Sequence, residues 1–231
     1  MKNKIIPLFE KCGFLICKIK NTVKILIFGT VMSANVTANQ VALEPIKLSQ
    51  PNIKSGKTIM ECLQERRSVR EFSAKDLSLE DISNLLWAAN GINRADGRRT
   101  APTARNCQEI DVYLINKDGA YLYVPVDDLL QPVYRGDLRE AIGAGQNFVN
   151  AAPVILLIVG DIEKLGGDSE RNKNLMWADG GIVSQNINIF CAGQNLATVT
   201  RAMMDEKVLR EALKLKDSQY LLLNNPVGYK K

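Results

Sequence analysis

The feature that most constrains this fold is an unbroken apolar run, VILLIVG at residues 154–160, which follows directly after Pro153. A short continuous run of this kind is typical of a central strand, because such a strand is buried on both of its faces. A sheet that contains this strand needs helices to cover it. We therefore predict an α+β fold in which helices flank a central sheet.

The clearest helix is predicted in the segment LSLEDISNLLWAANG. Four apolar side chains fall at the i, i+3, i+4 and i+7 positions of one helical face, namely Ile82, Leu85, Leu86 and Ala89. Ser78 and Asp81 resemble a capping box at its start, and Gly91 supplies a stop signal at its end. The pattern predicts one amphipathic helix that packs on the sheet.

Other segments predict further elements of both kinds. They are a helix from the N-cap Thr58 to about Arg67, a hairpin around Asp118-Gly119, a long and largely buried helix at 174–193 interrupted by Gly180-Gly181, a short helix capped by Asp205, and a late strand at 218–229. Residues 91–108 lack periodicity and are predicted to form a loop. Trp87 and Trp177 are expected in the core.

The N-terminal residues carry the net charge of the chain. Residues 1–38 contain six lysines and one acidic residue, whereas residues 39–231 contain 24 basic and 24 acidic residues. Three lysines precede the short apolar run ILIFGTVMSA, and Val36 and Ala38 fit the small positions before a signal-peptidase site. We predict a cleaved secretory signal peptide and a periplasmic or otherwise exported protein, with an uncleaved amphipathic anchor as the alternative.

The chain is therefore divided into three parts. After the signal peptide at 1–38, residues 39–57 contain two prolines and a glycine and are predicted to form an extended N-terminal arm. Residues 58–231 are predicted to form the folded domain. Because the chain after the signal peptide has no net charge, a nucleic-acid partner is not expected. Membrane contact is expected only through the export signal.

Histidine is absent from the whole chain. This absence excludes Ser-His-Asp and Cys-His catalysis in their usual forms, and it excludes histidine-based metal sites. Cys62, Cys107 and Cys191 follow the signal peptide without a CxxC pair, so we expect small buried side chains and no metal site. If the protein is an enzyme, an organic cofactor is expected to carry its chemistry.

Four motifs occur in a fixed order: RRSVREF at 66–72, APTARNCQEIDVYL at 101–114, ADGGIVSQNINIFCAGQNLAT at 178–198, and VGY at 227–229. Together they resemble the nitroreductase family of flavin oxidoreductases, and within it the SagB-like dehydrogenase branch. The resemblance covers roughly residues 58–229. It implies a nitroreductase-like, mostly antiparallel sheet flanked by helices, and FMN bound at the interface of a homodimer.

The resemblance also implies a set of FMN-binding residues: Arg66, Arg67, Ser68, Arg70, Asn106, Gln108, Thr200, Arg201 and Ala202. Guanidinium and hydroxyl donors at the first motif suit a phosphate. Arg70 stands where the family places a cation near the N1–O2 edge of the flavin. Asn106 and Gln108 would contact the ring or ribityl edge, and the segment from Thr200 would pack on the ring mostly through its backbone.

The implied activity is that of an FMN-dependent oxidoreductase. It would transfer hydride or electrons between a reduced donor such as NAD(P)H and a small organic acceptor of the nitroaromatic or quinone type. No catalytic residue is assigned, because hydride transfer to a flavin needs no protein acid or base. The alternatives are an exported flavin-binding protein without turnover, and a structural export-pathway domain without a cofactor.

Several residues leave the site open to a plainer interpretation. Arginines at a helix end also complement its dipole as a solvated surface. A second cluster, Arg94, Arg98, Arg99 and Arg105, is either a solvated loop or a site that selects an acidic substrate or a nucleotide phosphate. The segment NLAT lacks the glycines of the family motif, and the chain ends at Lys231 without the family's longer basic tail.

Overall fold

The computed structural model describes residues 42–231, and the predicted signal peptide lies outside the described residues. The sheet has seven strands in the order β1-β4-β3-β2-β5-β7-β6, and each neighbouring pair is antiparallel. The strands are β1 (Ile46–Lys47), β2 (Ile110–Ile115), β3 (Gly119–Val124), β4 (Leu129–Arg135), β5 (Val154–Asp161), β6 (Leu196–Thr198) and β7 (Gln219–Tyr229). This arrangement confirms the predicted α+β class.

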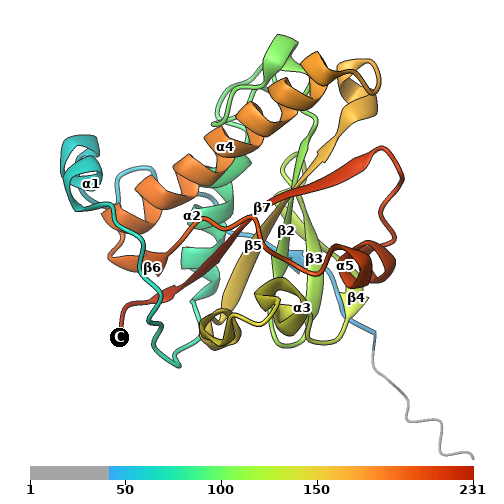
Figure 1. Ribbon diagram of the computed structural model, residues 1–231. Coiled ribbons are helices and arrows are strands. Elements are labelled where there is room, and N and C mark those ends of the chain that lie inside the picture. Colours follow the sequence, from blue (N-terminus) through green and yellow to red (C-terminus); the bar gives the residue numbers. More distant parts are fainter. Residues whose placement is uncertain (1–41) are drawn as a thin grey trace, which may run out of the picture. The chain divides into compact units, whose positions relative to one another are not determined.

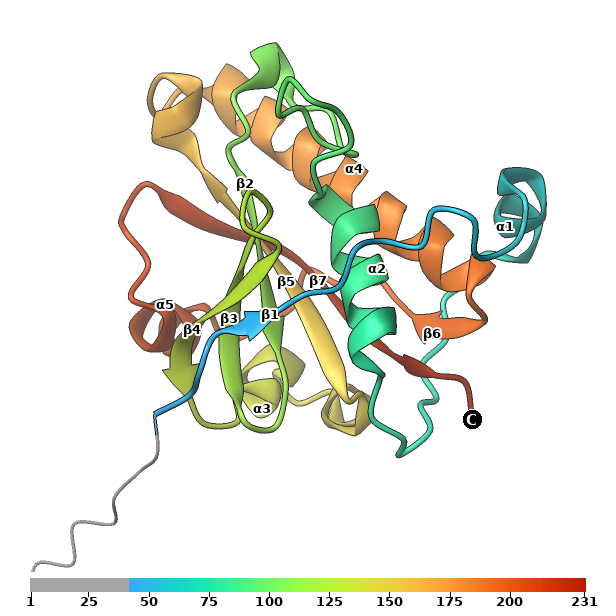
Figure 2. The same ribbon diagram turned by 180° about the vertical axis from the view of Figure 1, so that it is seen from behind.

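Helices cover both faces of this sheet (Figures 1 and 2). The α-helices are α1 (Ile59–Glu65), α2 (Leu79–Asn90), α3 (Arg139–Gly143), α4 (Glu170–Gly193) and α5 (Glu206–Leu213), and the 3-10 helices are η1 (Ala104–Asn106), η2 (Asn147–Ala151) and η3 (Ile162–Leu165). Two hydrophobic clusters result, one beneath α2 and α4 and the other beneath α3 and α5.

Strand β5 is the centre of the sheet, as its apolar run predicts. It pairs with β2 on one side and β7 on the other, and all eight of its residues are buried. Leu156 and Ile158 belong to the cluster beneath α2 and α4, whereas Ile155 and Leu157 belong to the opposite cluster. Alternate side chains of one strand thus fill both layers of the core.

The predicted helix caps are confirmed. Thr58 and Glu61 form a complete capping box on α1, which ends at Glu65, two residues before the predicted end. At α2, Ser78 Oγ accepts a hydrogen bond from the Asp81 backbone N–H at 3.1 Å and donates one to the Asp81 carboxylate at 2.6 Å. In a usual capping box, a glutamate accepts from the backbone N–H of the N-cap residue. Here the shorter Asp81 side chain accepts from the Ser78 hydroxyl instead.

Helix α4 corrects three predictions. It runs through Gly180 and Gly181 without a break, and only eight of its 24 residues are buried. Trp177, expected in the core, is 44% exposed. Gly180 serves close packing, because a Cβ atom at this position would lie 2.8 Å from Leu222 Cδ1. Gly180 therefore lets the helix approach β7, and the glycine pair does not end the helix.

The N-terminal arm is extended, and it packs along the domain. It contributes β1, which pairs with β4, and Leu48 is buried in the core. The backbone N–H of Ser49 donates to Ser83 Oγ, and that of Asn52 donates to Asn84 Oδ1, so the arm is joined to α2. Within residues 42–231, no helix is both long enough and apolar enough to cross a membrane.

Candidate functional site

A basic pocket of about 400 Å³ forms where the turn after α1 meets the end of the chain. Its lining comprises Arg67, Ser68, Val69, Arg70, Glu71, Lys230 and Lys231. The turn is fixed by a 2.9 Å hydrogen bond from the Val69 N–H to the carbonyl of Thr198, and Phe72 bridges to Lys230. Four cationic side chains and a hydroxyl against one acidic side chain, Glu71, make this pocket suited to an anion.

This pocket includes Lys230 and does not include Arg66. Arg66 closes α1 through its backbone N–H, which donates to the carbonyl of Cys62, and it does not line the pocket. Lys230 does line the pocket, and its Nζ donates to Asn195 Oδ1 at 2.8 Å. No motif pointed to Lys230, because only the pairing of the chain end with Phe72 brings it to the turn.

The segment that begins at Thr200 lies beside this turn. Thr200 Oγ1 accepts hydrogen bonds from Asn188 at 2.9 Å and from Asn225 at 3.2 Å, and it lies 2.7 Å from Ser184 Oγ. These bonds connect the segment to α4 and β7. Ala202 follows with an exposed side chain. Thr200 is therefore held to α4 and β7 by its side chain, and Ala202 is exposed next to Arg201.

Arg201 is buried, and its guanidinium makes four hydrogen bonds within the chain. They reach the carbonyls of Ile142 and Gly143 at 3.0 Å each, Asn224 Oδ1 at 2.7 Å and Gln146 Oε1 at 3.0 Å. Its backbone N–H and C=O also pair with Asn224. The structure thus places Arg201 where it holds the segment to α3 and β7.

Phe148 joins the first motif to Arg201. The guanidinium carbon of Arg70 lies 5.9 Å from the centre of the Phe148 ring, and that of Arg201 lies 5.7 Å from the same centre. Cations near an aromatic face are attracted by its electron density. This contact brings Arg70 and Arg201, which are far apart in the sequence, into one group. Nothing in the sequence marked Phe148.

Asn106 and Gln108 lie in a different place, on the loop around η1. Arg105, Asn106 and Gln108 have φ values of 56°, 56° and 50°, a left-handed conformation that non-glycine residues rarely adopt. The Ala104 N–H donates to Asp179 Oδ2 at 2.8 Å, which joins the loop to α4. Such strain persists only where surrounding contacts enforce it, and it is frequent at functional sites.

A buried carboxyl pair lies under this loop. Glu109 is fully buried, and neither of its carboxyl oxygens has a hydrogen-bond partner among residues 42–231. Burial, and then the neighbouring Asp179 carboxyl, raise the pKa of Glu109 to about 7. This pair is not evident in the sequence, because the two carboxyl groups belong to separate motifs.

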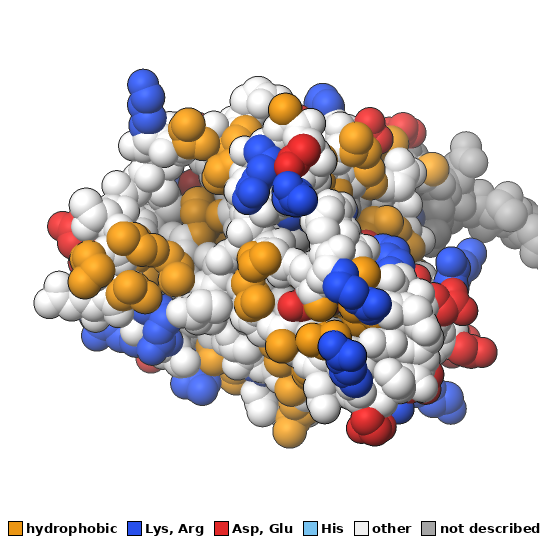
Figure 3. Space-filling model, turned by 90° about the horizontal axis from the view of Figure 1, so that it is seen from above, with side chains coloured by type: hydrophobic (Ala, Val, Ile, Leu, Met, Phe, Trp, Pro, Cys, Tyr) orange, Lys and Arg blue, Asp and Glu red, His pale blue; other side chains and the backbone are white. Residues whose placement is uncertain are grey.

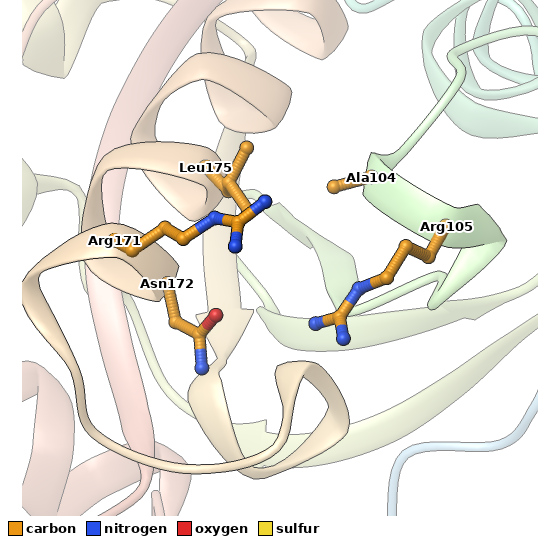
Figure 4. Close-up of a pocket in the computed structure, with 5 residues that line it drawn as sticks. All are labelled: Ala104, Arg105, Arg171, Asn172 and Leu175. Carbon is orange, nitrogen blue, oxygen red and sulfur yellow. The ribbon is translucent and has the colours of Figure 1, made fainter.

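Two basic cavities flank η1. One, of about 290 Å³, is lined by Ala104, Arg105, Arg171, Asn172 and Leu175, and the two arginine side chains extend into it from opposite sides (Figure 4). The other, of about 270 Å³, contains Arg94, Arg98, Arg99 and Asn106. Three of the four arginines in the predicted second cluster thus share one cavity, and Arg105 points into its neighbour.

The predicted site residues form two groups, one on the turn after α1 (Arg67, Ser68 and Arg70) and one on the loop around η1 (Asn106 and Gln108). The turn and the loop lie toward opposite ends of α4 (Figure 1). The loop with Asn106 is joined to the helix at Asp179, whereas α1 packs against Gly193 at its C-terminal end. Fourteen residues of helix separate these contacts, which corresponds to about 21 Å. One chain therefore does not combine the two groups into a single small site.

The chain is an α+β protein with a single antiparallel sheet and a basic pocket where the turn after α1 meets β7 and the residues after it. The family model described as "Nitroreductase family" matches residues 63–229, and the chain belongs to this family. A candidate nitroreductase from Methanocaldococcus jannaschii is 28% identical over 199 residues, which cover 81% of this chain and 98% of that protein.

Solved structures agree with this assignment. The crystal structure of a candidate nitroreductase from Ralstonia eutropha is 33% identical, with a TM-score of 0.76 over 81% of this chain and 90% of that one. An FMN-dependent nitroreductase from Clostridium difficile is 17% identical, with a TM-score of 0.54 over 74% of this chain and 87% of that one. The second likeness concerns the fold alone.

Proposed function

We propose that this protein is an FMN-dependent oxidoreductase that transfers hydride or electrons from a reduced donor such as NAD(P)H to a small nitroaromatic or quinone acceptor. The observation that carries the proposal is the basic pocket with Arg67, Ser68, Arg70 and Lys230 in a nitroreductase fold. A phosphate monoester carries about two negative charges at neutral pH, so this donor set fits the phosphate of FMN.

Names of related proteins support the cofactor and the donor. The Clostridium difficile protein is named as FMN-dependent. A Parabacteroides distasonis structure, 18% identical with a TM-score of 0.55, is named as an NADH dehydrogenase or NAD(P)H nitroreductase. These names agree with a flavin enzyme that takes electrons from a nicotinamide cofactor.

The residues of this chain would bind and orient the cofactor. Ser68 and the surrounding cations hold the phosphate, and Arg70 supplies positive charge where the resemblance expects the pyrimidine edge of the ring. Bound FMN supplies the hydride and electron transfer. The chain would hold the ring in place, and no side chain is assigned as a proton donor or acceptor.

The proposal includes a homodimer. Asn106 and Gln108 are too far along α4 from the basic pocket to act in the same copy, whereas a second copy would bring its loop to the pocket. Apolar side chains are exposed on α1 and α4: Ile59 57%, Met60 72%, Leu63 49%, Trp177 44% and Ile182 37%. Figure 3 shows hydrophobic side chains gathered at the end where Figure 1 places α1. A partner copy would bury such surface.

The test of this function is the visible spectrum of the purified protein before and after addition of FMN. Flavin absorption retained through desalting, and bleached by NADH or NADPH, is the expected result. Retained flavin that no donor reduces would favour a flavin-binding protein without turnover. A folded protein that retains no flavin would refute the proposal.

Export from the cytoplasm is a separate proposal that rests on residues 1–38. The expected result is that the mature protein begins at Asn39 and is recovered from the exported fraction. N-terminal sequencing of the purified protein tests this directly. An intact N-terminus in the cytoplasmic fraction would contradict it.

A further inference from the structure

The cavity beside η1 contains positive charge that the protein itself does not neutralise. It measures about 270 Å³, and three arginines, two threonines and Asn106 contribute to its lining. Arg98 is paired with Asp96 at 2.6 Å. Among residues 42–231, neither Arg94 nor Arg99 has a carboxylate within 4 Å.

Arg99 is the most informative residue of this cavity. It is half-buried, and loss of water lowers the pKa of its guanidinium, which nonetheless stays charged at neutral pH. Its Nε donates to Gln108 Oε1 at 3.1 Å, a neutral acceptor. Asp111 lies close enough to favour the charged form, but its own ion pair is with Lys164 at 3.4 Å.

A partly desolvated guanidinium without a charged partner favours the binding of an anion. Arg94 is exposed and adds a second guanidinium without a carboxylate partner among residues 42–231, since its Nε donates to the side chain of Asn93 at 2.9 Å. Thr103 adds a hydroxyl at the cavity wall, whereas the Thr100 hydroxyl already donates to the Trp87 carbonyl at 3.1 Å. Two guanidinium forks with a hydroxyl form the kind of donor set that recognises carboxylate or phosphate groups.

The position of this cavity connects it to the proposed flavin site. Asn106 lines the cavity, and Gln108 accepts the hydrogen bond from Arg99, so both proposed flavin contacts on this loop adjoin it. Figure 3, viewed onto the end of the molecule that carries the loop, shows Lys and Arg side chains on this face. An anion held here would lie beside the reacting substrate.

We propose that this cavity is an anion subsite that holds a carboxylate or phosphate group of a substrate, with Arg94 and Arg99 as its specificity-determining residues. The inference rests on the proposed function for its place in catalysis. The anion has two possible sources, an acidic electron acceptor or the phosphates of a dinucleotide donor. In either case the enzyme favours an anionic substrate over a neutral one of the same shape.

The test compares the FMN-loaded full chain with the double variant Arg94→Gln/Arg99→Gln, using 4-nitrobenzoate and its neutral analogue 4-nitrobenzamide. If the acceptor supplies the anion, the ratio of kcat/KM for the two acceptors falls about tenfold or more. If the donor supplies it, that ratio is unchanged and the KM for NADH or NADPH rises by a similar factor. If the double variant changes neither the ratio of kcat/KM for the two acceptors nor the KM for NADH or NADPH, the subsite is refuted.

Two further variants keep the result interpretable. Arg171→Gln removes a guanidinium from the neighbouring cavity, and it should leave both ratios as in the unmodified protein. Arg99→Lys keeps the charge but removes the fork, so it should retain part of the preference lost in Arg99→Gln. An effect of Arg171→Gln equal to that of the double variant would place the anion elsewhere and overturn the proposal.

A binding measurement separates this proposal from the proposed function. Calorimetric titration of the protein without added flavin uses 4-nitrobenzoate, NADPH and inorganic phosphate as probes. At least one should bind about tenfold more weakly to the double variant, with Arg171→Gln unaffected. A protein that retains no FMN yet shows this loss refutes the function and keeps the subsite. Conversely, the flavin-loaded protein could reduce 4-nitrobenzamide while the double substitution leaves the binding of all three probes unchanged. That result would support the proposed function and refute the subsite.

Discussion

At the scale of single residues, ionisation of the buried Glu109 carboxyl group is unfavourable for the fold. Its carboxyl is fully buried beside Asp179, which already accepts the Ala104 N–H. Ionising both acids places two like charges in a region of low polarity. We infer that Glu109 is protonated over much of the acidic range, and that its ionisation opposes folding near neutral pH.

The stability of the protein should therefore depend on pH through Glu109. Its pKa is about 7 in the folded chain, against a reference value of 4.5. Because the folded state holds this proton more tightly, the associated stability is present below pH 4.5 and is lost as the pH rises to about 7. The loss amounts to at most about 3 kcal/mol.

Glu109→Gln should remove this dependence. Relative to the unmodified protein, the variant should gain free energy of unfolding at pH 8 and gain much less at pH 5. Urea denaturation at both pH values measures the difference. Glu44→Gln, which changes an exposed acid of the arm, is the control. An equal effect of Glu109→Gln at the two pH values would contradict the shifted pKa.

Ser68 provides a residue-scale test of the basic pocket. Ser68→Ala removes a neutral donor to the proposed phosphate, and a hydrogen bond to a charged group is worth about 1.5–3 kcal/mol. We expect the Kd for FMN to rise at least about tenfold in a fluorescence titration. Ser73→Ala, just outside the pocket lining, should leave the Kd unchanged. Unchanged affinity in Ser68→Ala would remove this hydroxyl from the site.

At the scale of elements, α4 contains adjacent glycines in opposite environments. A Cβ atom at Gly180 would meet Leu222 Cδ1 at 2.8 Å, whereas one at Gly181 would meet nothing within 4 Å. Both residues are helical, so alanine at either position would lower the entropy of the unfolded chain. Only the packing against β7 distinguishes them.

The glycine pair should therefore respond oppositely to alanine. Gly181→Ala should stabilise the protein by up to about 1 kcal/mol, the usual difference in helix propensity. Gly180→Ala should destabilise it by about 1–3 kcal/mol, because the fully buried Leu222 must move. Chemical denaturation of the two variants gives the comparison. A stabilising Gly180→Ala would show that the core at β7 adapts freely.

At the scale of the whole molecule, the separated groups of site residues predict complementation between copies. Ser68→Ala/Arg70→Ala damages one group, and Asn106→Ala/Gln108→Ala damages the other. If each site combines one group from each copy, a mixed dimer of the two variants has one intact site and one doubly damaged site.

Mixing the two variants should therefore restore FMN binding that neither shows alone. Random exchange of subunits would leave about a quarter of all sites intact. Retained flavin absorbance after desalting measures this fraction, and each variant mixed with itself is the control. No recovery, in a mixture shown by sedimentation to contain mixed dimers, would refute a site shared between copies.

Much of the fold followed from local patterns. The caps at Thr58, Ser78 and Asp205, the central strand and the hairpin were all predicted, because each depends on neighbouring residues. Strand β4, the short strands β1 and β6, and helix α3 were not predicted, since their segments carry little periodicity. Gly180-Gly181 was misread as a break, because the pattern does not show a strand lying against the helix.

The sequence by itself determined the chemistry that is possible: no histidine, an electrically neutral body, and donors suited to a phosphate in the turn 66–70. Only the tertiary structure decided which donors meet. It brought Lys230 to Arg67, turned Arg201 into the interior, and placed Glu109 beside Asp179. These arrangements depend on contacts between residues distant in the chain, and burial and charge act through those contacts.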